Sequence, residues 1–166
     1  MKTYKKGLIL VGLAIVSTTV KPLMFQKEIS TEEISSELDS LYNGIAEHNI
    51  SKNQATQTLG GLRKYVQKNG QGNEKLLNAS EAIADLTDDL VTGYMTGWGA
   101  VSPDFNRHVR NVEDAIEVLK NDPWWFGKKR EVRAVLLNVG ERVLSLMPKT
   151  KDVYGSKQEV TIEKYQ

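Results

Sequence analysis

The chain has 166 residues and a formal net charge of +1 at pH 7, with 22 Lys and Arg against 21 Asp and Glu. It contains no cysteine, which excludes disulfide bonds, a thiol nucleophile and lipidation at a cysteine. Four of the basic residues lie in an N-terminal leader and the remainder is slightly acidic, so we expect no nucleic-acid partner. About 140 residues outside the leader are enough for one domain with a sizeable core.

Residues 1–25 have the pattern of a secretory signal peptide or a signal anchor. Three lysines precede an uncharged, mostly apolar run from Gly7 to Val20, and Lys21 and Pro22 end this run. As a helix the run would reach only about 21 Å, short of a hydrocarbon core of roughly 30 Å. Extending the span to Phe25 gives a sufficient length but places Lys21 and Pro22 inside it. The lysines predict that the N-terminus stays cytoplasmic and that the rest of the chain crosses the membrane.

We therefore expect an exported protein that is either anchored in the membrane through residues 1–25 or released as a periplasmic or secreted domain. No A-x-A-like cleavage site follows the apolar run, which slightly favours the anchor. The alternative is that this segment forms a buried helix of a soluble protein.

From Ser30 onward the spacing of apolar residues is helical. Ser30 begins a Ser-x-x-Glu capping box, which predicts a helix over residues 31–48. A second helix is predicted to follow Ser51, its N-cap, and to reach about Lys68. Its middle contains two adjacent glycines, at 60–61, which suggest either a kink or a close helix crossing. The short break between these helices makes them antiparallel neighbours.

Three further helices follow the glycine-containing turn at residues 69–72. The third is predicted from Asn73 to Tyr94, and glycines then end it. The fourth is predicted after Ser102, because a serine cap, a proline at the first helical position and an acidic residue follow one another there. It ends before Pro123. The fifth begins after Gly127 and carries an apolar stripe towards residue 146.

These elements predict one all-α domain, a bundle of four or five helices over residues 26–148. It stands behind the N-terminal hydrophobic signal or signal-anchor helix of residues 1–25. The tail, residues 149–166, has no helical stripe. We expect it to be disordered, with a short hairpin as the alternative.

A glycine-rich corner between the third and fourth helices contains Tyr94 and Trp98. Flexible glycines beside these rings would let them present aromatic faces to a sugar, a peptide or a protein partner. The spacing of the glycines matches no phosphate-binding motif. The interpretation we favour is a helix connection whose aromatic side chains close one end of the bundle.

The second aromatic cluster is Trp124, Trp125 and Phe126, which precedes Lys128 and Lys129. Aromatic residues beside cations resemble the interfacial belt of membrane proteins, so this cluster is a candidate for membrane or partner contact. The interpretation that we favour is that it packs the end of the bundle, and at least one ring should be buried in either case. The fourth helix, about 24 Å long, should place this cluster and the glycine-rich corner at opposite ends.

Catalytic chemistry has little support in the sequence. The two histidines, His48 and His108, have no metal-ligand spacing, so we expect no metal and no cofactor. His108 borders the apolar face of its helix. Four acidic residues share one face of the third helix, where paired carboxylates could serve a glycosidase, but a solvated surface is the common role of such a face. These residues are Glu81, Asp85, Asp88 and Asp89.

We expect a non-enzymatic, exported or membrane-anchored helical envelope protein that acts through protein or membrane contacts, with an envelope protein as its possible partner. One alternative is a small hydrolase or binder of cell-wall glycan, in which Glu81, Asp85 or Asp104 supplies the acid and Trp98 stacks on a sugar. Another is an extracytoplasmic bundle that binds a small molecule between its helices. No residue is assigned a catalytic role.

Overall fold

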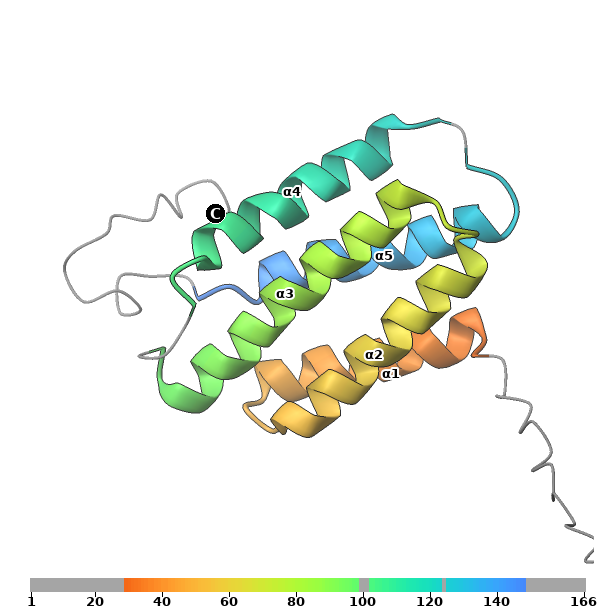
Figure 1. Ribbon diagram of the computed structural model, residues 1–166. Helices are drawn as coiled ribbons and strands as arrows, with labels where there is room; N and C mark the ends of the chain where they lie inside the picture. The colour runs from red at the N-terminus through yellow and green to blue at the C-terminus, as the bar shows by residue number, and fades with distance from the viewer. Residues whose placement is uncertain (1–28, 99–101, 124, 149–166) are drawn as a thin grey trace, which may run out of the picture.

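The computed structural model describes residues 29–98, 102–123 and 125–148, which form five α-helices and no strand (Figure 1). The predicted all-α class is therefore confirmed for this part of the chain. The leader, the tail and Trp124 lie outside the described residues. The helices are α1 (Thr31–Ala46), α2 (Lys52–Asn69), α3 (Glu74–Thr96), α4 (Phe105–Asn121) and α5 (Lys128–Ser145). None of these helices is both long enough and apolar enough to cross a membrane.

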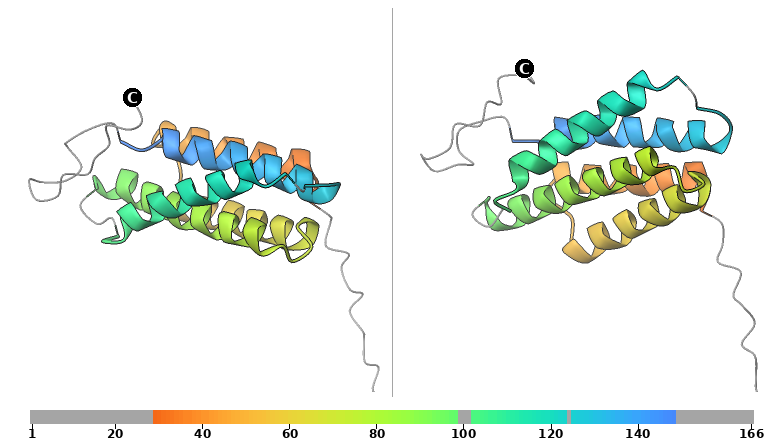
Figure 2. Two further views of the ribbon diagram at one scale, coloured as in Figure 1. Left: turned by 90° about the horizontal axis from the view of Figure 1, so that it is seen from above. Right: turned by 45° about the horizontal axis from the view of Figure 1, so that its top comes forward.

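The five helices run alternately up and down the bundle, so that α1, α3 and α5 share one direction (Figure 1). α3 and α5 each pack against all four other helices, and α3 is the more central because its contacts are the more extensive. Figure 2 shows α1 and α5 together on one side of the bundle, with α2 and α3 on the other. The short connection from α1 to α2 makes these two helices antiparallel neighbours, as predicted, and the connection from α2 to α3 does the same for the next pair.

The bundle has two ends, which we name for their order along the chain. The proximal end holds Ile29, where the described chain begins, together with Asn69 and Lys128 (Figure 1). The distal end holds Trp98, at the close of α3, and Leu146, just after α5. α1, α3 and α5 begin at the proximal end, whereas α2 and α4 end there.

Side-chain caps explain where the first three helices begin. Ser30 accepts a hydrogen bond from the backbone N–H of Glu33 at 3.1 Å, and Ser51 forms a full capping box with Gln54. Asn73 accepts from the first turn of α3. The start of the fourth helix differs from the prediction, because α4 begins at Phe105 and no side chain caps it.

The predicted apolar stripes form the core. The largest fully buried side chains come from all five helices, and they are Tyr42, Ile34, Leu38, Leu41, Ile45, Leu62, Leu76, Ile83, Leu86, Leu90, Leu119 and Leu136. The glycine pair does not interrupt α2. A Cβ atom on Gly61 would lie 3.6 Å from Cδ1 of Ile34, an ordinary van der Waals distance, so Gly61 faces α1 but the helix crossing does not require a glycine there.

Candidate functional site

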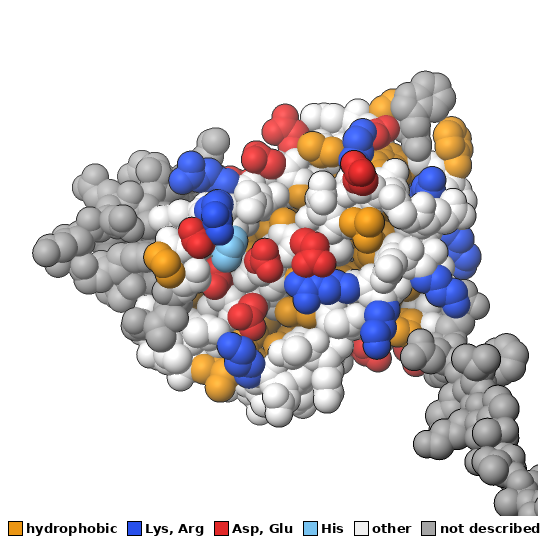
Figure 3. Space-filling view, in the orientation of Figure 1, with side chains coloured by type: hydrophobic (Ala, Val, Ile, Leu, Met, Phe, Trp, Pro, Cys, Tyr) orange, Lys and Arg blue, Asp and Glu red, His pale blue; other side chains and the backbone are white. Residues whose placement is uncertain are grey.

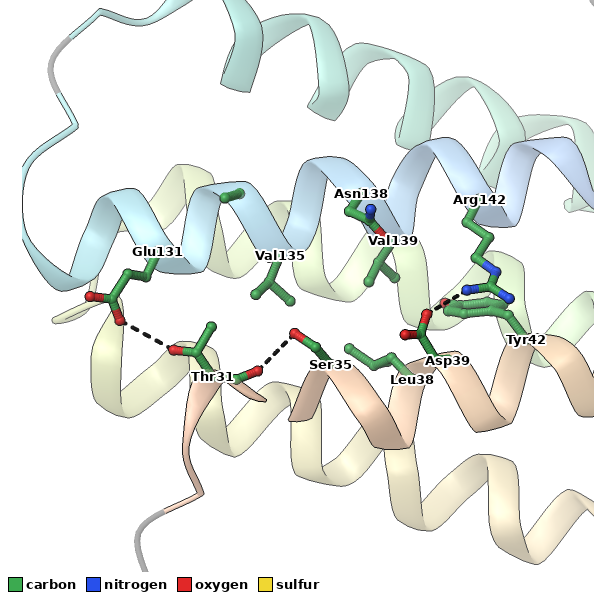
Figure 4. Close-up of a pocket in the computed structure, with 11 residues that line it drawn as sticks. Thr31, Ser35, Leu38, Asp39, Tyr42, Glu131, Val135, Asn138, Val139 and Arg142 are labelled. Carbon is green, nitrogen blue, oxygen red and sulfur yellow. Dashed lines mark hydrogen bonds and ion pairs between the residues drawn. The ribbon is translucent and has the colours of Figure 1, made fainter. Parts of the chain in front are cut away.

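A groove of about 550 Å³ runs between α1 and α5, which lie side by side and point the same way (Figure 4). Its floor is apolar and consists of Leu38, Val135 and Val139, while polar groups stand along its rim. A volume of this size falls within the range of small-ligand sites. The groove is therefore a candidate binding site that the sequence stripes alone did not locate.

Polar contacts hold the groove at both of its ends. Towards the proximal end, the hydroxyl of Thr31 donates a hydrogen bond to Glu131 at 3.2 Å and lies 2.8 Å from the hydroxyl of Tyr65. Towards the distal end, Arg142 forms an ion pair with Asp39 and donates to the side-chain oxygen of Asn43 at 2.6 Å. These contacts fix the spacing of α1 and α5, and they leave donors and acceptors beside the apolar floor.

A second hollow, of about 530 Å³, lies at the proximal end next to the groove. The two share Thr31 and Glu131 in their walls. The other wall residues come from the start of α1, the end of α2 and the start of α5. Lys128 is close enough to Glu32 to help lower the pKa of that exposed carboxyl, although the backbone and Ser30 hydrogen bonds lower it more.

The glycine-rich corner closes the distal end of the bundle. The hydroxyl of Tyr94 donates a hydrogen bond to the carbonyl oxygen of Leu146 at 2.8 Å, which ties the end of α3 to the end of α5. The Tyr94 ring meets His48 edge-on at 4.6 Å between centroids and Trp98 at 5.1 Å, and Trp98 meets Phe105 at 6.0 Å. Burial raises the pKa of the Tyr94 hydroxyl.

Gly93 is what allows Trp98 to fold back onto α3. A Cβ atom at Gly93 would lie 2.4 Å from the Trp98 ring, a separation that no side chain can adopt. Trp98 itself has a φ of 67°, in the left-handed region, and follows Gly97, which is also left-handed. The two site residues predicted here, Tyr94 and Trp98, are thus brought together, and their mutual packing supports the interpretation as a closed bundle end.

The second aromatic cluster divides between core and surface. Trp125 is buried, as expected for at least one member, and its indole N–H has no acceptor among the described residues. Phe126 is 70% exposed. Lys128 is exposed and lies 3.5 Å from Glu131, whereas Lys129 is half-buried. As predicted, this cluster and the glycine-rich corner lie at opposite ends of α4 (Figure 1).

One prediction about the acidic face of α3 is wrong. Asp89 does not point to water: it is only 7% exposed, and its Oδ2 lies 2.6 Å from Nδ1 of His108 on α4. It faces α4 because it lies one helical turn after Leu86, at the edge of the core. Burial raises the pKa of the Asp89 carboxyl, and the hydrogen bond and charge of His108 oppose that rise without cancelling it.

The sequence does not predict the pairing of Asp89 with His108, because the apolar stripe divides α3 into an inner and an outer face without taking the position of α4 into account. A signal was present. His108 borders the apolar face of α4, and α3 and α4 form an antiparallel hairpin. Asp89 lies seven positions before the end of α3 and His108 three positions after the start of α4, so this hairpin brings the two side chains together.

Two of the three remaining acids of the α3 face, Glu81 and Asp88, have a cation nearby. Glu81 lies 2.8 Å from Arg63 of α2, and Asp88 lies 3.8 Å from Lys52. Within the described ranges, no three His, Asp or Glu side chains group so as to hold a metal ion.

No family model matches the chain, and no curated protein or solved structure is significantly similar to it. Its function must therefore follow from three features of the molecule itself. These are the groove between α1 and α5, the aromatic closure of the distal end, and the exposed aromatic and basic residues of the proximal end.

Proposed function

We propose that this chain is a non-enzymatic helical module, exported and held at a membrane through residues 1–25, which acts through protein or membrane contacts at the membrane surface. The observation that carries the proposal is the position of Ile29 at the proximal end of the bundle (Figure 1). Only residues 26–28 separate it from the leader, residues 1–25. A fully extended link of this length spans at most about 14 Å.

Such a short link gives the bundle little freedom. If residues 1–25 lie in the bilayer, the proximal end stays near the headgroups, and any partner must be reached from the membrane surface. The bundle is slightly acidic and its distal end is closed, which suits a domain that contacts proteins or a membrane better than one that binds nucleic acid.

Glycan hydrolysis has less support in the geometry. Asp104 lies 3.0 Å from Arg107 of the same helix, and Glu81 is paired with Arg63 of α2. Trp98 uses its ring to pack against Gly93 and Phe105.

A reporter fusion tests the exported location. We expect a phosphatase that folds only outside the cytoplasm to be active when it is fused to the C-terminus of the full chain. The same fusion without residues 2–25 should be inactive although it is made in equal amount. Equal activity of the two fusions, or none from the full chain, would refute export by the leader.

The groove supports a second candidate function, which is binding of a small polar molecule outside the cytoplasm. Its apolar floor and its rim of Ser35, Asn138 and Arg142 offer contact area together with directional hydrogen bonds (Figure 4). A ligand that occupies it should raise the melting temperature of the protein. Replacement of Asn138 by leucine should abolish that rise. The matched change Asn106→Leu on α4 should not.

A further inference from the structure

The proximal end carries an exposed surface that the groove and the core do not use. We call it the proximal patch and define it by Phe126, Lys128, Lys129 and Arg130. The ring of Phe126 is 70% exposed, an unusual state for a phenylalanine that lies next to a buried tryptophan. Neither Lys129 nor Arg130 has an ion-pair partner among the described residues. An aromatic ring and cations at one corner match the composition of interfacial contacts.

Backbone dipoles add to the positive character of this end. Three helices begin at the proximal end and two finish there, so N-terminal dipole ends outnumber C-terminal ones. Ser30 and Asn73 cap α1 and α3, but no side chain caps α5, whose first turn carries the patch cations. Backbone N–H groups at such a start favour an anionic oxygen ligand.

The charges of the bundle are arranged along its axis. On the face seen in Figure 3, Lys and Arg side chains gather along the edge where α2 ends and α5 begins. Acidic side chains are spread over the rest of this face. The second half of α3 adds Asp85 and Asp88 towards the distal end, whereas Asp89 is buried against His108. A negatively charged surface would therefore attract the proximal end and repel the distal one.

We propose that the proximal patch rests against anionic phospholipid headgroups. The bundle then stands on the membrane, with Phe126 at headgroup depth and the Tyr94–Trp98 closure facing away. This inference rests on the proposed function, because residues 1–25 bring the patch to the bilayer. Attraction to an anionic leaflet fades within a Debye length of about 8–10 Å. A link of three residues keeps the patch close to that range.

The absence of cysteine from the chain allows a direct test. The full chain carries one cysteine, at Phe126→Cys or Met95→Cys, labelled with the same environment-sensitive fluorophore. Met95 is the matched position, since it is also apolar and 58% exposed but lies near the distal end. The protein is placed in vesicles of phosphatidylcholine, with or without phosphatidylglycerol, that contain a lipid with a nitroxide quencher on its headgroup.

We expect the label at Phe126→Cys to be quenched roughly threefold more than the label at Met95→Cys when phosphatidylglycerol is present, because only the proximal end is attracted to anionic headgroups. The added change Lys129→Glu with Arg130→Glu should remove most of this difference. The matched pair Arg107→Glu with Arg110→Glu on α4 alters the net charge equally and should preserve it. Neither pair includes a core residue.

Flotation of the vesicles separates the two ways in which the inference can fail. If the protein floats with both kinds of vesicle but the two labels are quenched equally, the membrane attachment stands and the orientation is refuted. If the protein floats with neither, residues 1–25 do not attach it, and the proposed function fails together with the inference.

Discussion

Asp89 is the residue at which burial and charge oppose each other most directly in the described chain. Its carboxyl is buried between α3 and α4 with His108 as its hydrogen-bond partner. Desolvation raises its pKa above the value of about 3.9 that it has in an unfolded chain. The ionised form is therefore disfavoured in the folded state. Stability from this site is fully present below the unfolded pKa and is lost as pH rises through the folded pKa.

Replacement of Asp89 by asparagine should remove the pH dependence of stability that the Asp89 carboxyl causes. The amide oxygen can still accept a hydrogen bond from His108, and no buried charge remains. We expect the free energy of unfolding at pH 7 to stay the same or to rise by about 1 kcal/mol. Urea unfolding at pH 7 and at mildly acidic pH measures it, with Asp88→Asn, a half-exposed neighbour on the same helix, as the control. A loss of more than about 2 kcal/mol at pH 7 would show that the ionised pair stabilises the fold.

Gly93 and Gly60 form a matched pair of helical glycines with opposite surroundings. A Cβ atom at Gly93 would overlap the Trp98 ring, while nothing lies within 4 Å of one at Gly60. We expect Gly93→Ala to lower the free energy of unfolding by about 1–3 kcal/mol, since Trp98 must move. Gly60→Ala should raise it by up to about 1 kcal/mol through helix propensity alone. Thermal unfolding of both variants measures the difference, and shifts in the same direction would refute the close packing of Trp98.

Among the elements, α5 also contacts all four other helices, but α3 makes the most extensive contacts and therefore contributes most to holding the bundle together. Leu86 lies at its centre with no exposed surface, whereas Leu77 on the same helix is only partly buried. We expect Leu86→Ala to cost about 2–5 kcal/mol and Leu77→Ala less than half as much. Urea unfolding measures both losses of unfolding free energy, from the shift of the midpoint at an unchanged dependence on urea concentration. Equal costs would mean that α3 is not the centre of the core.

Periodicity was sufficient to predict the helices themselves. The five stripes matched five helices, and Ser30 and Ser51 are caps, as their sequence context predicted. Boundaries that depend on tertiary packing were less accurate. α3 continues to Thr96 because the left-handed Gly97, rather than Gly93, ends it, and the Trp98 ring packs against Gly93 inside the helix.

Contacts between residues on different helices could not be predicted from a single sequence. The buried pair of Asp89 and His108 depends on the register of α3 against α4, and the groove depends on α1 lying beside α5. Those two helices are separated by more than half of the described chain. Several bundle topologies bury the same stripes, so the stripes alone do not select this pairing.

In the molecule as a whole, the two ends of the bundle differ in what they expose to solvent. The distal end is closed by aromatic packing and a hydrogen bond from Tyr94 to α5. The proximal end exposes Phe126 beside cations and holds Ile29, the point from which the membrane segment would extend. Our account assigns the proximal end to the bilayer and leaves the groove and the distal end accessible to partners.

Fractionation of the expressed protein combined with intact mass tests this account most directly. We expect the full-length species, of 18.6 kDa, in the membrane fraction, where it should resist extraction by salt and by carbonate. A soluble exported species shorter by about 20 residues would keep the exported location but contradict the membrane attachment. Full-length protein in the cytoplasm would contradict the account as a whole, because the leader would then be part of a soluble protein.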